Sequence, residues 1–146
     1  METSSGKSVF GLDQNMAAGL SYIPLGPFPV IWSIIVIATD KTSKLARFHA
    51  VQSLLLLGSA VVALVAIPIG WVILWVVSLI VYGVAAAINI PTLGYIAILL
   101  GYLGYLALLA YGLAVFAGWI ISCIQAFRGK IFKFPLIGKM ADTWSN

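Results

Sequence analysis

The feature that most constrains this chain is a long stretch without formal charge. Between Phe48 and Phe127 there is no Asp, Glu, Lys or Arg. The chain has only 146 residues, and a soluble domain of that size leaves much of its surface in water. A helix needs about 20 apolar residues to cross a bilayer, so this stretch has room for three or more spans. It predicts an integral membrane protein.

The few basic residues gather in two clusters on either side of the apolar stretch. Charged residues make up 8% of the chain, against roughly 25% in soluble domains. The clusters are Lys41, Lys44 and Arg47, and then Arg128, Lys130, Lys133 and Lys139. A nucleic-acid surface needs a continuous basic face, which two separate clusters do not supply. They are typical of contacts with lipid headgroups, so membrane lipids are the expected partner and nucleic acid is not.

We expect an all-α, polytopic transmembrane bundle with about four membrane helices. Their expected ranges are 16–38, 45–67, 71–88 and 93–127, within a transmembrane domain of residues 15–128. Residues 1–14 form a polar tail, and residues 129–146 form a basic amphipathic tail.

Proline and glycine set the expected boundaries of these helices. Prolines 24, 27 and 29 predict a kink in the first helix, because each proline removes a backbone donor. The Pro68-Ile69-Gly70 segment predicts the break between the second and third helices. Ser43 is the expected cap of the second helix, and Gly129 the residue that ends the fourth.

Four spans conflict with the distribution of charge. They would place the basic turn at residues 41–47 and the basic C-terminal tail on opposite sides of the membrane. The positive-inside rule places both in the cytoplasm. Three or five spans would remove the conflict, if helix 71–88 were re-entrant or residues 93–127 formed a hairpin. We expect the C-terminus to be cytoplasmic and leave the number of spans open.

A polar group opens the second expected helix. His49, Gln52 and Ser53 stand three and four residues apart and therefore share one helix face. Polar side chains in an apolar helix face a bundle interior, a cavity or another polypeptide. One interpretation is structural, with His49 hydrogen-bonded at headgroup level. The other is a role in transport or recognition.

The chain lacks the residues for a catalytic or metal centre. It has one His, one Cys and four acidic residues, three of them near the termini. A metal centre needs several such ligands, and no Gly-rich phosphate loop is present. We therefore expect no enzyme activity, no cofactor and no metal.

Small residues recur in the apolar stretch at intervals of four. Such residues let helix backbones approach closely, within one chain or between copies. The expected packing residues are Gly83, Ala87, Gly101, Ala110, Ala114 and Gly118.

The C-terminal segment alternates basic and large apolar residues from Arg128 to Asp142. This composition is typical of a segment that lies along the membrane interface, with rings in the acyl boundary and lysines at phosphates.

Three segments together resemble the Tic20-like family, which includes the DUF4870 and UPF0132 groups of small bacterial and archaeal membrane proteins. They are residues 11–17, 47–53 and 128–142. The resemblance implies a non-enzymatic protein whose signature residues are Arg47, Phe48, His49, Gln52 and Ser53. In the tail, the signature residues are Lys133, Pro135, Gly138 and Asp142. Because the polar signature and the basic tail lie at the ends of otherwise apolar helices, we expect the tail around Lys133, Pro135 and Gly138 to dock against the cytoplasmic end of helix 45–67.

The leading functional hypothesis is a multi-pass protein of the cytoplasmic membrane that contacts other polypeptides in a translocation or membrane-organising assembly. One alternative is a small transporter or channel whose pathway is lined by His49 and Gln52. The other is a purely structural homo-oligomer held by the small residues.

Overall fold

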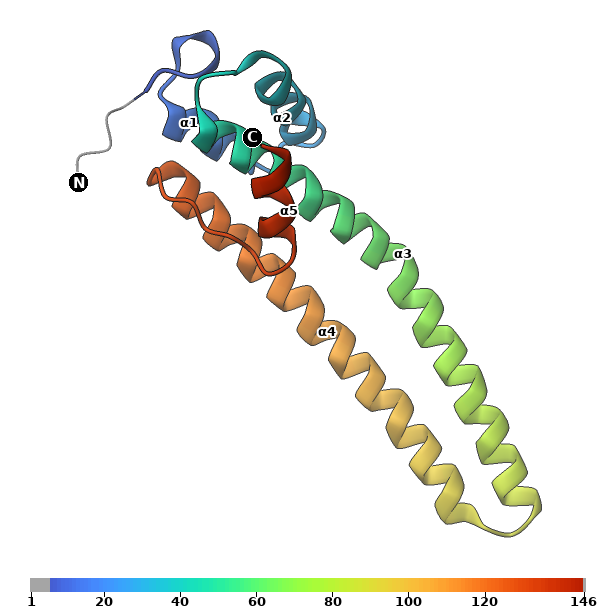
Figure 1. Ribbon diagram of the computed structural model, residues 1–146. Coiled ribbons are helices and arrows are strands. Elements are labelled where there is room, and N and C mark those ends of the chain that lie inside the picture. Colours follow the sequence, from blue (N-terminus) through green and yellow to red (C-terminus); the bar gives the residue numbers. More distant parts are fainter. Residues whose placement is uncertain (1–5, 146) are drawn as a thin grey trace. The chain divides into compact units, whose positions relative to one another are not determined.

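A computed structural model describes residues 6–145, and these fold almost entirely as helices (Figure 1). A short 3-10 turn, η1 (Val9–Gly11), precedes α1 (Gln14–Leu20), α2 (Phe28–Thr39), α3 (Lys44–Ala87), α4 (Pro91–Phe127) and α5 (Ile137–Trp144). Lys7 and Asp13 form an isolated bridge, and the described residues contain no strand. The all-α prediction is confirmed.

The first expected helix is two helices rather than one kinked helix. α1 ends at Leu20, and α2 begins only at Phe28. Gly26 between them has a positive φ of 56°, which lies outside the helical region and suits glycine. Pro24 and Pro27 also have no N–H to donate within a helix. With 12 residues, α2 is about 18 Å long, which is shorter than a hydrocarbon core of about 30 Å.

The expected break at Pro68 is also absent, so this boundary prediction was wrong. α3 continues through Pro68 for a total of 44 residues. Proline removes the donor to the carbonyl four residues earlier. A helix in an apolar environment nevertheless continues through proline, because unwinding would leave further backbone groups without partners.

Both long helices end in the same hydrogen-bonded cap. At the end of α3, the N–H of Ile90 donates to Ala85 O at 2.8 Å, while Asn89 adopts a φ of 63°. At the end of α4, the N–H of Lys130 donates to Gln125 O at 2.9 Å, and Gly129 has a φ of 70°. A left-handed residue with these bonds is a Schellman cap. The prediction that Gly129 ends the fourth helix is confirmed.

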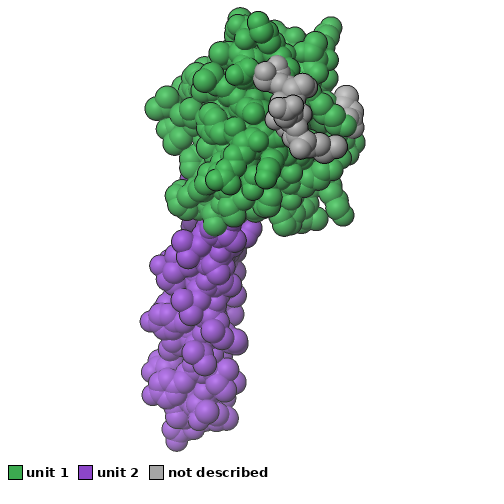
Figure 2. Space-filling model, turned by 90° about the vertical axis from the view of Figure 1, so that its left-hand side faces the viewer, with its two compact units in different colours: residues 1–59, 115–146 green, residues 60–114 purple. Residues whose placement is uncertain are grey.

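The chain divides into two compact units (Figure 2). Unit 1 contains residues 6–59 and 115–145, and unit 2 contains residues 60–114. Unit 2 is an antiparallel hairpin of α3 and α4. Its aromatic pairs follow in register, with ring centroids 5.8 Å apart for Trp71 and Tyr105 and 5.5 Å apart for Trp75 and Tyr102.

The side chains of unit 2 are apolar and largely exposed. α3 and α4 are long and apolar enough to cross a membrane, and they are the two helices that meet this test among the described residues. The core helix of a soluble protein would be covered by the rest of its chain, whereas Leu64, Ile80 and Leu113 are more than half exposed. An apolar surface of this kind suits a lipid environment. The prediction of four spans is not confirmed.

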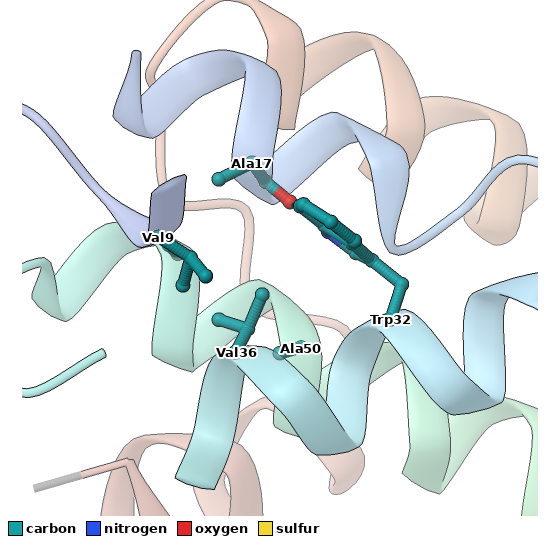
Figure 3. Close-up of a cluster of buried hydrophobic side chains, with 6 residues drawn as sticks. Val9, Ala17, Trp32, Val36 and Ala50 are labelled. Atoms are coloured by element: carbon teal, nitrogen blue, oxygen red, sulfur yellow. The ribbon is translucent and has the colours of Figure 1, made fainter. Parts of the chain in front are cut away.

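Unit 1 has its own core, which joins the N-terminal segment to α3. Val9, Ala17, Trp32, Val36 and Ala50 are buried together (Figure 3). The indole Nε1–H of Trp32 donates to Ala17 O at 2.9 Å. This contact holds α2 against α1, and it satisfies the polar atom of a buried ring.

Candidate functional site

Polar groups before α3 fix where this helix begins. Ser43 Oγ accepts the backbone N–H of Ala46 at 3.2 Å, which is the bond of an N-cap residue. The prediction of Ser43 as a cap is confirmed. Asp40 Oδ1 accepts the backbone N–H groups of Thr42 and Ser43, each at 2.9 Å. Ser8 donates to the other oxygen of Asp40. The start of α3 is therefore tied to the N-terminal segment.

The signature residues that follow do not form an exposed surface. Phe48, His49 and Gln52 are completely buried, and Ser53 is nearly so. Arg47 is partly exposed. The buried side chains point into unit 1 of this chain, and the role of the signature residues in recognition stays a prediction.

His49 connects three parts of unit 1. Its Nε2 lies 3.1 Å from Lys130 O, and its Nδ1 lies 3.1 Å from Tyr22 Oη. A carbonyl oxygen only accepts, so Nε2 carries the hydrogen between these atoms. In the neutral tautomer that these partners assign, Nδ1 accepts a hydrogen bond from the hydroxyl group of Tyr22. One imidazole thus joins α3 to the N-terminal segment and to the chain after α4.

Gln52 extends the same network toward α4 and the tail. Its Nε2–H₂ donates to Tyr22 Oη at 3.3 Å and to Ser122 Oγ at 3.1 Å. Its Oε1 accepts the backbone N–H of Phe134 at 3.5 Å. Both donors and the acceptor of the amide therefore have partners. We call His49, Gln52, Tyr22 and Ser122, with the backbone of Lys130 and Phe134, the polar network.

Ser53, the third polar residue of the predicted face, lies apart from this network. Its hydroxyl is 2.8 Å from Ser33 Oγ of α2 and donates to Ala50 O at 2.9 Å. Sequence reasoning found His49 and Gln52 but missed Tyr22 and Ser122. The signal for Ser122 was available, since it is the single serine of the apolar helix α4 and polar residues in such helices face protein.

The C-terminal tail packs on both long helices within unit 1. The Phe134 ring lies so close to Gly118 that a Cβ there would overlap it. Gly138 lies against the backbone of Lys133, and Ala141 shares a buried cluster with Phe48.

The side chains of three predicted tail residues lie at the surface, outside this packing. Lys133 Nζ and Asp142 Oδ2 form an ion pair of 2.8 Å at the surface, and Pro135 is exposed.

The small residues divide into two groups. Gly101 is buried beside Ser78 within unit 2, and Gly118 is buried under Phe134. The other predicted packing residues are exposed, and these are Gly83, Ala87, Ala110 and Ala114.

Two close approaches in unit 2 went unpredicted. Gly94 lies against Tyr82, and Gly104 lies against Leu74. Ser78 Oγ adds a bond to Ala97 O at 3.0 Å across the hairpin.

The chemistry of the polar network is that of a fold-stabilising hydrogen-bond system. Its members are neutral donors and acceptors that satisfy one another. No group of three or more His, Cys, Asp or Glu residues that could hold a metal occurs among residues 6–145. The absence of catalysis stays a prediction.

Comparison with known proteins gives the family. The chain is 32% identical to a UPF0132 membrane protein of Methanocaldococcus jannaschii over 96% of both chains. It is 27% identical to a UPF0132 membrane protein of Archaeoglobus fulgidus, over 90% of this chain and 94% of that one. A second M. jannaschii UPF0132 membrane protein is 26% identical over 92% of this chain and 71% of its own length.

The fold and the buried polar network thus belong to a helical membrane protein, and the chain is a member of the UPF0132 family. No protein-family model matches the chain. No solved structure matches it either.

Proposed function

We propose that this chain is a non-catalytic protein of the cytoplasmic membrane that contacts other polypeptides, in a translocation or membrane-organising assembly. The observation that carries the proposal is where the two kinds of residue lie. The polar signature residues are buried within unit 1, while the apolar faces of unit 2 are exposed. The resemblance of residues 47–53 and 128–142 to the Tic20-like family supports the same class of function.

The positions that we assign to partner contact are the exposed small residues of α3 and α4, which are Gly83, Ala87, Ala110 and Ala114. A Cβ added at Gly83 would meet no atom within 4 Å, and Ala110 and Ala114 are exposed. Lipid tails cover any apolar side chain, but small residues additionally let a second helix approach closely. These positions therefore suit a helix of another membrane polypeptide.

The geometry gives less support to a transport pathway through His49 and Gln52. Both ring nitrogens of His49 and both ends of the Gln52 amide have partners within the chain. A solute would have to displace these buried bonds, and each group left unsatisfied costs about 1–3 kcal/mol.

The polar network also supports an orientation. The bond from His49 near the start of α3 to Lys130 just after α4 brings the two basic clusters into one unit. The positive-inside rule then favours the cytoplasm for both clusters and for the C-terminus. The turn at Asn89 lies at the opposite end of the hairpin and is assigned to the other side.

Photocrosslinking in cells tests the contact proposal. Probes at Gly83 and Ala114 are expected to form adducts with other polypeptides, while a probe at exposed Lys41 in the polar turn is the control. Adducts with lipid alone would contradict the proposal. Adducts formed only with further copies of this chain would favour the homo-oligomer over contact with other polypeptides.

A further inference from the structure

α5 has two apolar sides, and only one of them packs within unit 1. On the inner side, Gly138 and Ala141 are buried, and Ala141 packs with Phe48 and Val51 of α3. This side holds the tail in place. The residues of the other side are exposed.

The outer side is a line of large apolar residues. Leu136, just before the helix, is 81% exposed, Met140 is 44% exposed and Trp144 is 58% exposed. Met140 and Trp144 are four residues apart in α5 and therefore share one helix face, and Leu136 directly precedes the helix. We call these three residues the stripe. A large exposed apolar stripe on a short helix indicates an apolar partner.

The charge around this stripe selects the kind of partner. Between Arg128 and Asp142 there are four basic residues and one acidic residue, a net charge of +3. Lys139, next to Met140, and Lys130 are exposed. The single acidic residue, Asp142, already pairs with Lys133. A basic rim beside an apolar stripe fits an anionic lipid surface.

The size of the stripe argues against a protein partner. A helix of eight residues is about 12 Å long, while a stable protein interface buries about 1,200 Å² or more. A lipid surface needs only a few inserted side chains and adjacent cations.

We propose that the outer side of α5 binds the anionic lipid surface of the protein's own membrane. Leu136, Met140 and Trp144 enter the boundary between headgroups and acyl chains, and Lys139 lies at the phosphates. Phe134 does not take part, because its ring is packed over Gly118. The sequence composition predicted an interfacial tail, and the structure assigns the inserted side chains. This inference is independent of any polypeptide partner.

A spin label at position 140 tests the proposal in the full chain. Cys123 is replaced by serine, and Met140→Cys carries the label. The protein is reconstituted in vesicles of phosphatidylcholine or of phosphatidylglycerol. We expect the ratio of oxygen to water-soluble nickel collisions to be several-fold higher in phosphatidylglycerol, because oxygen concentrates in the acyl region. Lys139→Gln should reduce this difference.

A label at Lys41→Cys, in the exposed polar turn, is the matched control and should stay accessible to nickel in both vesicles. Equal collision ratios at positions 140 and 41 in phosphatidylglycerol would overturn the proposal. Dipolar broadening between labels at position 140 would also overturn it, since the stripe would then face a second copy. A crosslinking failure at Gly83 would leave these readouts unchanged.

Discussion

Gln52 shows at the scale of one residue how this fold is specified. Its amide reaches Tyr22 before α2, Ser122 in α4 and the backbone of Phe134 in the tail. Each buried hydrogen bond replaces one that the same group made with water in the unfolded chain, so its net contribution to the free energy of folding is small. In an apolar interior, however, any arrangement that leaves these groups unpaired is penalised. The network therefore selects one packing of segments that are distant in sequence.

Replacing Gln52 by leucine should destabilise unit 1 by about 2–3 kcal/mol, because Tyr22, Ser122 and the Phe134 N–H each lose a partner. Thermal unfolding in detergent, followed by tryptophan fluorescence, measures the loss. Ser122→Ala removes one of the same bonds, so the double variant should cost less than the sum of the two single changes. Additive costs would contradict a shared network.

Asp40 makes the stability dependent on pH. Burial opposes its ionisation, but hydrogen bonds from Ser8, Ser43 and Thr42 outweigh burial and lower the pKa of this carboxyl. Because the folded pKa lies below the unfolded value, the stabilisation is fully present at neutral pH. It is lost as the pH falls through the folded pKa.

The Asp40→Asn variant should therefore be less stable than the wild type at neutral pH, by about 1 kcal/mol. The difference should shrink as the pH falls below the ordinary carboxyl pKa of about 3.9. It should disappear only below the lowered pKa of the folded state, where the wild-type carboxyl also becomes neutral. Unfolding midpoints of both proteins across this range provide the comparison. A difference that does not change with pH would show that charge is not the cause.

At the scale of elements, local signals in the sequence identified some features and missed others. The Ser43 cap and the end of α4 at Gly129 follow from short-range chemistry and were predicted. The continuity of α3 through Pro68 was not, because the rule that proline ends a helix rests on water as an alternative partner for the backbone. Tyr22 was missed since its partners are set by tertiary packing, whereas Ser122 did carry a signal, as a serine in an apolar helix.

The contact between α4 and the tail depends on the absence of a side chain at position 118. Gly118→Ala should destabilise the protein by about 1–3 kcal/mol, because the new Cβ overlaps the Phe134 ring and the tail must shift. Gly112→Ala is the matched control on the same helix. A Cβ there meets nothing within 4 Å, so better helix propensity should stabilise it by up to about 1 kcal/mol. Unfolding midpoints that move in the same direction would refute this account.

At the scale of the whole molecule, the single helix α3 changes the topology argument. With 44 residues, α3 is about 66 Å long, and α4, with 37 residues, is about 56 Å. Each exceeds a hydrocarbon core of about 30 Å, so each can cross it once without a break. Two crossings in a hairpin return the chain to the side from which it started. The conflict between four spans and the positive-inside rule disappears once ranges 45–67 and 71–88 become one helix.

This topology predicts which positions a membrane-impermeant maleimide reaches in intact cells. With Cys123 replaced by serine, Asn89→Cys should react without lysis, because the proposed orientation places this turn outside the cell. Lys41→Cys and Lys139→Cys should react only after lysis, because the His49–Lys130 bond keeps both basic clusters in one unit and the proposed orientation places that unit in the cytoplasm. If Lys41 and Lys139 react from opposite sides, the hairpin does not cross the membrane as two single helices. If both react in intact cells while Asn89 is protected, the hairpin is inserted in the opposite orientation, and the charge clusters do not set it.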